Sequence, residues 1–318
     1  MPGDYDVLLW GVYFCDLIFT DLPQVPRLGA EVFSTDFSMT PGGPFTTAVA
    51  MHRLGLRVGW MCDFGDDVFS QFVLAAAKHE GIEDGLFQLH PFPVRRVSAA
   101  FSFAHDRGFV SFMDDVAQTS PVPLIERHRP RCVFLPHLHY GAPSEWPSEG
   151  DGQVYADLFA CARAQGAVIF MDCQSTDATL EAPGVVEALQ AVDVFAPNEV
   201  EALQLTGAAT VEQALARLAE LTPLVIVKRG AEGAIAGLDG GVVQVPAIPV
   251  EVVDTTGAGD CFSAAFIHGF LKQWDLEANL RFASAAAALS TCAIGGQAAL
   301  PTKDEVHRFL EAQESSRR

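Results

Sequence analysis

Apolar residues occur along this 318-residue chain in short runs that alternate with longer amphipathic stretches. From about residue 130 onward, the runs 132–135, 168–171 and 192–196 predict strands, and the stretches 154–165 and 185–189 predict helices. This alternation is typical of a parallel sheet with helices on both faces. Ligands bind such sheets at the carboxyl ends of the strands, so we expect a site there.

The first third of the chain combines similar elements with a second pattern. Residues 7–10 and 58–62 predict buried strands, and residues 45–54 predict a helix. The segments at about 31–41 and 96–113 instead alternate between apolar and polar side chains, which favours strands with one covered face. We expect these two segments to form a small layer that covers a cleft or pairs with a second copy.

Residues 250–272, which read VEVVDTTGAGDCFSAAFIHGFLK, combine three predicted elements. Residues 250–253 predict the end of a strand, Gly257 to Gly259 a tight turn, and phenylalanines spaced by four a buried helix. Because Gly257, Ala258 and Gly259 have almost no side chain, their N–H groups and the positive end of the helix dipole can converge on an anion. This turn is therefore a candidate phosphate site.

Asp260 follows the turn in the first turn of the predicted helix. A carboxylate there is either a helix cap or a general base that removes a proton from a hydroxyl attacking a bound phosphoryl group. Two other glycine motifs are absent, since the chain contains no GxxxxGKS or GxxxxGKT and has Phe262 where a dinucleotide fingerprint needs its third glycine.

Composition narrows the choice of partner and compartment. The formal net charge of −20 argues against nucleic acid or an anionic membrane as a partner, so any phosphate site must be local. The seven cysteines show no CxxC pair, which favours reduced thiols in the cytoplasm. The apolar run 7–19 contains Asp16 and is too short to span a bilayer, so we interpret it as a buried strand with Asp16 in the turn after it.

The string DTTGAGDCF at residues 254–262 resembles the C-terminal signature of the ribokinase-like (PfkB) family of sugar and nucleoside kinases. The resemblance implies an α/β fold, a ribokinase-like three-layer sandwich with a mostly parallel central sheet and a small β-strand lid. It implies one kinase domain over residues 1–318, with lid strands at about 31–41 and 96–113. The family often uses this lid as a dimer clasp, which implies a homodimer.

The resemblance also implies roles in catalysis and acceptor binding. In the family the GAGD turn is the anion hole and its aspartate is the base, which implies these roles for Gly257, Ala258 and Gly259 and for Asp260. The implied acceptor contacts are Asp16, the pair Gly42 and Gly43, and Thr46, which stands where the family usually has asparagine.

For the nucleotide and its ions, the resemblance implies two further sets of residues. Asn198 and Glu201 match the NxxE motif that organises magnesium, water and phosphate, and Lys228, Gly230 and Gly233 lie where the family places ATP. A potassium site would use Asp254 and Thr256 together with Ser290, Ala293 and Gly295. The position of Ala299 departs from ribokinase, which has a serine oxygen there.

We therefore predict an ATP-dependent kinase that transfers the γ-phosphate to a hydroxyl of a sugar or related polyol. A nucleoside or sugar-phosphate kinase of the same fold is the alternative. The carboxylate of Asp16 favours an unphosphorylated acceptor, whereas Arg95, Arg96 and Arg107 in the lid segment would suit an acidic one.

Two other classes compete with the kinase. His137, His139 and Asp172 follow predicted strands, and an HxH with a later aspartate is also found in zinc-dependent hydrolases. A sugar-binding protein of the same fold without activity is a further alternative, which the intact Asp260 disfavours.

Overall fold

The structure is a computed structural model that describes residues 3–103, 107–116, 118–138, 151–174 and 178–316. Its first strand, β1 (Val7–Trp10), is apolar at every position because both of its faces are covered. Val7 and Leu9 belong to one hydrophobic core, and Leu8 and Trp10 to another. Because side chains alternate along a strand, these two cores lie on opposite faces of the sheet.

Nine strands in the described part of the chain form one sheet, in the order β13-β12-β11-β10-β9-β8-β1-β4-β5. The strands from β11 to β5 are parallel, and β12 and β13 add an antiparallel hairpin at one edge. The sheet is therefore mostly parallel, as predicted. Besides β1, its strands are β4 (Val58–Phe64), β5 (Phe87–Leu89), β8 (Cys132–Leu135), β9 (Val168–Asp172), β10 (Val194–Ala196), β11 (Leu224–Lys228), β12 (Ala234–Leu238) and β13 (Gly241–Val245).

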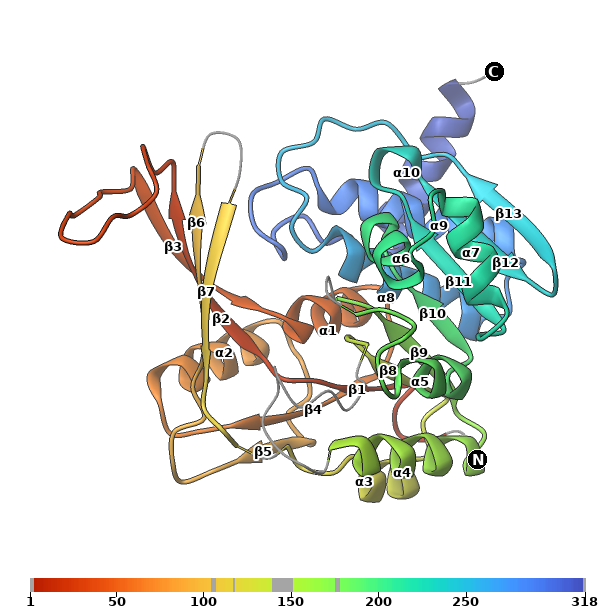
Figure 1. Ribbon diagram of the computed structural model, residues 1–318, viewed down its shortest axis with the longest axis horizontal. Helices are drawn as coiled ribbons and strands as arrows, with labels where there is room; N and C mark the ends of the chain where they lie inside the picture. Colours follow the sequence, from red (N-terminus) through yellow and green to blue (C-terminus); the bar gives the residue numbers. More distant parts are fainter. Residues whose placement is uncertain (1–2, 104–106, 117, 139–150, 175–177, 317–318) are drawn as a thin grey trace.

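Helices cover both faces of this sheet, which makes the predicted three-layer sandwich (Figure 1). The core that contains Val7 also receives residues of α1 (Pro44–Arg53), α2 (Val68–His79), α8 (Ala258–Leu271), α9 (Leu276–Ser290) and α10 (Lys303–Ser316). The core that contains Leu8 receives residues of α3 (Val122–His128), α4 (Asp151–Ala164), α5 (Val185–Ala191), α6 (Glu199–Thr206) and α7 (Val211–Ala219). A single 3-10 turn, η1 (Gly230–Glu232), follows β11 in the described residues.

Four further strands in the described residues form a separate sheet, the lid, in the order β3-β2-β6-β7. They are β2 (Phe14–Thr20), β3 (Asp36–Gly42), β6 (Arg96–Ser102) and β7 (Arg107–Met113). Figure 1 shows the lid standing to one side of the helices and the large sheet. The structure thus confirms a small strand lid at the predicted place.

The lid differs from its prediction in two respects. Asp16 does not lie in a turn but in strand β2, where it pairs with Thr40 of β3 and Ser98 of β6. The strand expected at about 31–41 begins only at Asp36 and continues to Gly42. The apolar run 14–20 forms a strand because it lies between two partners, which no local pattern reveals.

The strand end predicted at residues 250–253 is wrong. Strand β13 ends at Val245, and Val252 and Val253 are exposed in an irregular segment. Pro246 and Pro249 lie in this segment and have no N–H to donate to a neighbouring strand. The backbone N–H groups of Val253 and Asp254 instead donate to the carbonyl of Thr291 at 2.8 and 3.1 Å.

In the described residues, no helix has the length and apolar character needed to cross a membrane.

Candidate active site

The site lies at the carboxyl ends of the central strands, where three of them end in polar residues. Strand β9 ends at Asp172, β11 ends at Lys228, and Asn198 follows β10. An isolated parallel bridge joins Asn198 to Lys228, and the Lys228 N–H donates to the Pro197 carbonyl at 2.9 Å. The parallel sheet thus brings together residues that are far apart in the sequence.

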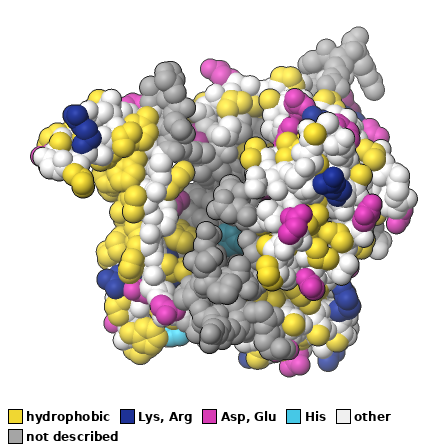
Figure 2. Space-filling view, viewed as in Figure 1, with side chains coloured by type: hydrophobic (Ala, Val, Ile, Leu, Met, Phe, Trp, Pro, Cys, Tyr) yellow, Lys and Arg dark blue, Asp and Glu magenta, His cyan; other side chains and the backbone are white. Residues whose placement is uncertain are grey.

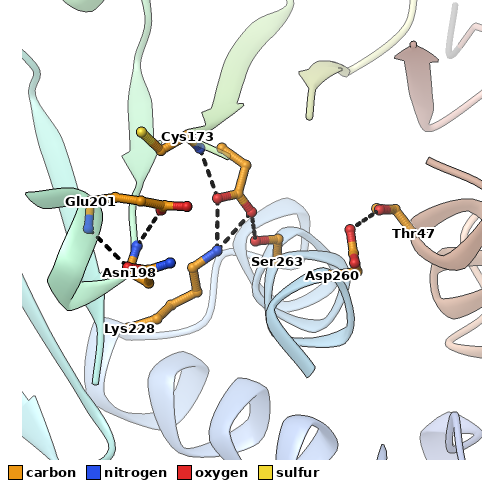
Figure 3. A network of polar contacts seen from close by, with 8 residues as sticks. Thr47, Cys173, Asn198, Glu201, Lys228, Asp260 and Ser263 are labelled. Atoms are coloured by element: carbon orange, nitrogen blue, oxygen red, sulfur yellow. Dashed lines mark hydrogen bonds and ion pairs between the residues drawn. The ribbon is translucent and has the colours of Figure 1, made fainter. Parts of the chain in front are cut away.

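Asp172 and Lys228 form a buried ion pair at this edge (Figure 3). Lys228 Nζ donates to Asp172 Oδ1 at 2.7 Å and to Oδ2 at 2.8 Å. The Ser263 hydroxyl of helix α8 donates to the same Oδ2 at 2.7 Å. Burial lowers the pKa of Lys228, but the Asp172 carboxylate more than offsets this, so the pKa is raised and the side chain stays charged.

Helix α8 begins at the glycine turn that the sequence marked as an anion site. Its N-cap, Gly257, has a φ of 77° and gives no side-chain cap, and the Ala258 N–H donates to the Thr255 carbonyl at 3.2 Å. The positive end of the helix dipole at this turn is therefore not compensated by a capping side chain and can face an anion. A Cβ on Gly257 would lie 2.9 Å from the Gly296 carbonyl oxygen and from Thr46 Cγ2. A Cβ on Gly259 would lie 3.5 Å from Lys228 Nζ, which places the ammonium beside the turn.

Asp260 lies in the first turn of α8 and contacts helix α1 (Figure 3). The Thr47 hydroxyl donates to Asp260 Oδ1 at 2.6 Å. The pKa of Asp260 is raised to about 6, first by burial and then by the charge of Asp172, although the Thr47 bond and the charge of Lys228 act in the opposite direction. The pKa of a general base is most useful near the working pH, so this shift suits proton removal near neutrality.

The predicted acceptor residues meet at the base of the lid. A Cβ on Gly42 would lie 2.1 Å from Asp16 Oδ2, so only glycine lets the backbone of β3 approach this carboxylate. Burial raises the pKa of Asp16 to about 6. Gly43, with a φ of 61°, is the N-cap of α1, the helix that carries Thr47. The structure therefore connects Asp16 to Asp260 through one short segment.

Thr46 lies between the acceptor residues and the glycine turn. Its side chain is buried, its methyl group faces Gly257, and its hydroxyl accepts a hydrogen bond from Gln297 Nε2 at 2.7 Å. The same Gln297 amide donates to the Pro41 carbonyl at 2.9 Å. These contacts hold β3, α1 and the turn together, and the expected contact of Thr46 with an acceptor stays a prediction.

Asn198 and Glu201 form a capping box at the start of α6. The Asn198 side chain accepts from the Glu201 N–H at 2.9 Å, and Glu201 Oε2 accepts from the Asn198 N–H at 2.7 Å. Glu201 is only 7% exposed, whereas Asn198 is exposed. Burial raises the pKa of Glu201, although its hydrogen bond with Asn198 and the charge of Lys228 act in the opposite direction.

Gly230 and Gly233, predicted to lie beside the nucleotide, bracket the turn η1 after β11. Both have a positive φ, 53° and 91°. A Cβ on Gly233 would lie 2.1 Å from the Val245 carbonyl oxygen, so the close approach of strand β13 already requires this glycine.

The candidate potassium ligands come from two segments that a carboxylate joins. Asp254 Oδ1 accepts from the Thr256 N–H and hydroxyl at 2.9 and 2.7 Å, and Asp254 Oδ2 accepts from the Gly295 N–H at 2.9 Å. The Ser290 hydroxyl donates to the Ala287 carbonyl at 2.8 Å, at the end of α9. Ala293 follows in the segment between α9 and Gly295.

The lid arginines proposed for an acidic acceptor have other partners. Arg95 forms a two-point ion pair with Asp114, with both distances 2.9 Å. Arg96 is buried, donates to the Asp63 carbonyl at 2.8 Å and lies over the ring of Tyr13. The side chain of Arg107 lies outside the described residues.

Sequence reasoning missed Thr47 and Ser263, and it assigned Asp172 only to the alternative zinc site. Thr47 bonds Asp260, Ser263 bonds Asp172, and Asp172 serves as the partner of Lys228. The position of Ser263, three residues after Asp260 on the predicted helix, was a usable signal because such residues share a face. Nothing in the sequence indicated that Thr47 rather than Thr46 reaches helix α8.

The model of the pfkB family of carbohydrate kinases matches residues 24–303 of the chain. The chain belongs to this family. Its members are ATP-dependent kinases that phosphorylate sugar hydroxyls, so the phosphotransferase activity expected from the sequence is the activity of the family.

Relatives of known activity align along nearly the whole chain. The ribokinase of Bacillus subtilis (strain 168) is 30% identical over 312 residues, covering 93% of this chain and 96% of the relative. The fructokinase of Klebsiella pneumoniae is 30% identical over 283 residues, covering 85% of this chain and 92% of the relative. The solved structure of Arabidopsis thaliana ribokinase complexed with ribose and ATP is similar with a TM-score of 0.81 at 22% identity, covering 98% of this chain and 99% of that one.

Because the chain belongs to a kinase family, we reject the alternative that it is a zinc-dependent hydrolase. Of its proposed ligands, Asp172 is bonded to Lys228 and Ser263, and His139 lies outside the described residues. Burial lowers the pKa of His137 to about 4, so it is neutral near pH 7. In the part of the chain that the structure describes, no three histidine, cysteine or acidic side chains cluster as metal ligands would.

Proposed function

We propose that this kinase phosphorylates a hydroxyl of an unphosphorylated sugar or related polyol, with Asp260 as the general base. The observation that carries the proposal is the continuous connection from Asp16 through Gly42 and Gly43 to Thr47 and Asp260. It links a half-buried carboxylate for acceptor hydroxyls to a second half-buried carboxylate beside an anion turn. Such a pair of groups is what transfer of a phosphoryl group to an alcohol requires.

The steps follow from these positions. Asp16 accepts hydrogen bonds from acceptor hydroxyls, and Gly42 and Gly43 let the backbone approach the acceptor. Asp260 takes the proton of the reacting acceptor hydroxyl. At the same time the acceptor oxygen forms a bond to the γ-phosphorus, and the bond between that phosphorus and the leaving oxygen of ADP breaks. Negative charge on the transferring phosphate is stabilised by N–H groups at residues 257–260 and by the dipole of α8.

The nucleotide site in this proposal is built by Asn198, Glu201, Lys228, Gly230 and Gly233, with ATP as the donor. A bound magnesium ion would supply positive charge that neutralises part of the charge of the phosphates. Glu201 fits a role at such an ion through water, since Mg²⁺ keeps several waters and needs only one or two carboxylates. Glu201 is held in place by the capping box at the strand ends, close to Lys228.

The contacts of the lid arginines favour an uncharged acceptor over a sugar phosphate. Arg95 and Arg96, the two whose side chains are described, are bonded to Asp114 and to the Asp63 carbonyl. Asp16 at the acceptor site would in turn repel a phosphate. A nucleoside remains the alternative of the same fold, because it too is uncharged and rich in hydroxyls.

A panel of acceptors tests this function. Free pentoses and hexoses, keto-deoxy acids, sugar phosphates and nucleosides are each offered with Mg-ATP, and the release of ADP is measured. We expect the highest kcat/KM with a free sugar or polyol. A sugar phosphate preferred by a wide margin would contradict the assignment of the acceptor class, and a nucleoside preferred would establish the alternative.

The proposal includes a potassium ion that raises activity without contacting the acceptor. A cation bound by carbonyl groups of Thr256, Ala293 and Gly295 would fix the glycine turn from the side opposite the phosphate. Asp254 already joins these two segments, which supports a site between them. Ser290 has its hydroxyl on Ala287, so it would contribute through its carbonyl.

Turnover in Tris buffer with potassium, sodium or a bulky organic cation at equal ionic strength tests this site. We expect the highest kcat with potassium, because its size suits a ring of carbonyl oxygens, and the lowest with the organic cation. Identical rates with all three cations would show that this chain has no such site.

We also propose a homodimer that pairs the lids of two copies, in the cytoplasm. Large apolar side chains are exposed on one face of the lid, on β3 and β7, among them Phe37 at 52%, Val110 at 64% and Phe112 at 52%. Figure 2 shows hydrophobic side chains gathered along the lid. An exposed apolar surface of this kind favours burial against a partner, and a second copy offers the same surface by symmetry.

Sedimentation of the wild type and of Phe37→Lys tests the dimer. We expect a dimer for the wild type and a monomer for the variant, because a lysine in the apolar contact would be buried without a partner. Asp36→Lys, which changes charge at an adjacent exposed position, is the control. A wild type that is monomeric at micromolar concentration would contradict the proposal.

A further inference from the structure

Charged side chains from several elements, buried or half-buried, gather beside the anion turn. Asp172 of β9, Glu201 of α6 and Asp260 of α8 bring carboxylates, and Lys228 of β11 brings an ammonium (Figure 3). The two acidic groups whose pKa is raised, Glu201 and Asp260, owe this first to burial. The carboxylates would repel a polyphosphate that binds in this site. Binding therefore depends on whether the Lys228 ammonium lies close enough to the phosphates to offset this repulsion.

The hydrogen bonds of Lys228 fix that position. An ammonium group has three N–H donors, and Lys228 uses two of them on the two oxygens of Asp172, at 2.7 and 2.8 Å. The same Nζ lies 3.5 Å from the place that a Cβ on Gly259 would occupy. One N–H is therefore left, and the nearest ligand site for it is the turn at residues 257–260.

Asp172 is itself fixed from two directions. Its Oδ2 accepts from the Ser263 hydroxyl of α8 at 2.7 Å, and its Oδ1 accepts from the Cys173 N–H at 2.9 Å. Asp172 is 3% exposed, so water does not compete for these bonds. The carboxylate thus holds Lys228 in one place relative to both the sheet and the helix that begins with the anion turn.

We propose that Asp172 is a positioning residue for phosphoryl transfer, which holds the Lys228 ammonium beside the turn so that its remaining N–H meets the γ-phosphate of ATP. The proposal rests on the proposed function, in which this turn binds the transferring phosphate. Asp172 acts through Lys228 and touches neither ATP nor the acceptor.

A purely structural role is the competing explanation of the ion pair. Buried ion pairs add little net stability, and replacing both partners with neutral side chains is often tolerated, whereas removing one partner leaves a buried charge. The Asp172 carboxylate also keeps the pKa of Lys228 raised despite burial, so the lysine stays charged at the site. The effect on folding stability and the effect on binding of the γ-phosphate can therefore be separated by comparing single and double variants.

The test uses Asp172→Asn, Lys228→Met and the double variant that carries both changes. The matched control is Asp193→Asn. Asp193 lies at the amino ends of the central strands, directly before β10, and its Oδ2 accepts from the Ile169 N–H of β9 at 2.7 Å. Loss of this carboxylate perturbs the same strand without reaching the anion turn.

Binding of Mg-ADP and of Mg-AMP-PNP, a non-hydrolysable ATP analogue, is measured by calorimetry without acceptor. The two nucleotides differ by the γ-phosphate and the imido nitrogen that joins it to the β-phosphate. We expect Asp172→Asn and Lys228→Met each to weaken AMP-PNP binding by about tenfold to a hundredfold, the range for one charged hydrogen bond, while ADP binding changes little. In the double variant we expect no further loss, since Asp172 acts through Lys228. For the control Asp193→Asn, we expect the ratio of the AMP-PNP and ADP affinities to equal that of the wild type.

Thermal unfolding of the same proteins separates positioning from folding. The single variants leave one buried charge unpaired, so we expect a lower Tm for each, and the double variant regains much of the loss. A structural role predicts that the double variant also regains AMP-PNP binding. Positioning predicts that it does not, because the ammonium is absent.

The proposal is overturned if Asp172→Asn discriminates between AMP-PNP and ADP as the wild type does, or if the double variant recovers this discrimination. It is also overturned if the wild type binds both nucleotides equally. Failure of the proposed function looks different: the wild type would discriminate between the nucleotides but transfer phosphate to none of the acceptors in the panel.

Discussion

The burial of carboxylates at one edge of the sheet is the constraint on which the site depends. A carboxylate taken out of water is destabilised unless hydrogen bonds or a cation compensate it. Asp172 accepts hydrogen bonds from the Lys228 ammonium and the Ser263 hydroxyl. Glu201 accepts from the Asn198 N–H, and Asp260 accepts from the Thr47 hydroxyl. The groups that compensate Asp172 and Asp260 come from other elements, so their charge compensation and the packing of the helices on the sheet depend on one another.

Helix α8, which carries Asp260 and Ser263, begins without a capping side chain. Gly257 supplies no cap, and its positive φ and close neighbours exclude a larger residue. The positive end of the α8 dipole therefore lies beside the Lys228 ammonium at this turn, and the two together favour a bound anion. The segment from Gly42 to Thr47 joins the acceptor carboxylate Asp16 to the base Asp260, which follows this turn.

Much of this arrangement could be predicted from the sequence, because strands ending in polar residues and the DTTGAGDCF string are local patterns. The strand Phe14–Thr20 was missed, since Asp16 interrupts an apolar run and its pairing partners lie about 20 and 80 residues away. The bond from Thr47 to Asp260 spans 213 residues, and the sequence carries no sign of it. Val250 to Val253 look like a strand but have prolines before them that cannot donate to a ladder.

The central claim is that Asp260 removes the acceptor proton, and the turnover of Asp260→Asn tests it most directly. With the acceptor that the wild type prefers, we expect kcat to fall by about a hundredfold to ten thousandfold, the usual contribution of a general base, while the affinity for Mg-ATP is retained. Asparagine has nearly the same shape but cannot accept the proton. An Asp260→Asn enzyme that turns over within about tenfold of the wild type, well short of that range, would contradict the account.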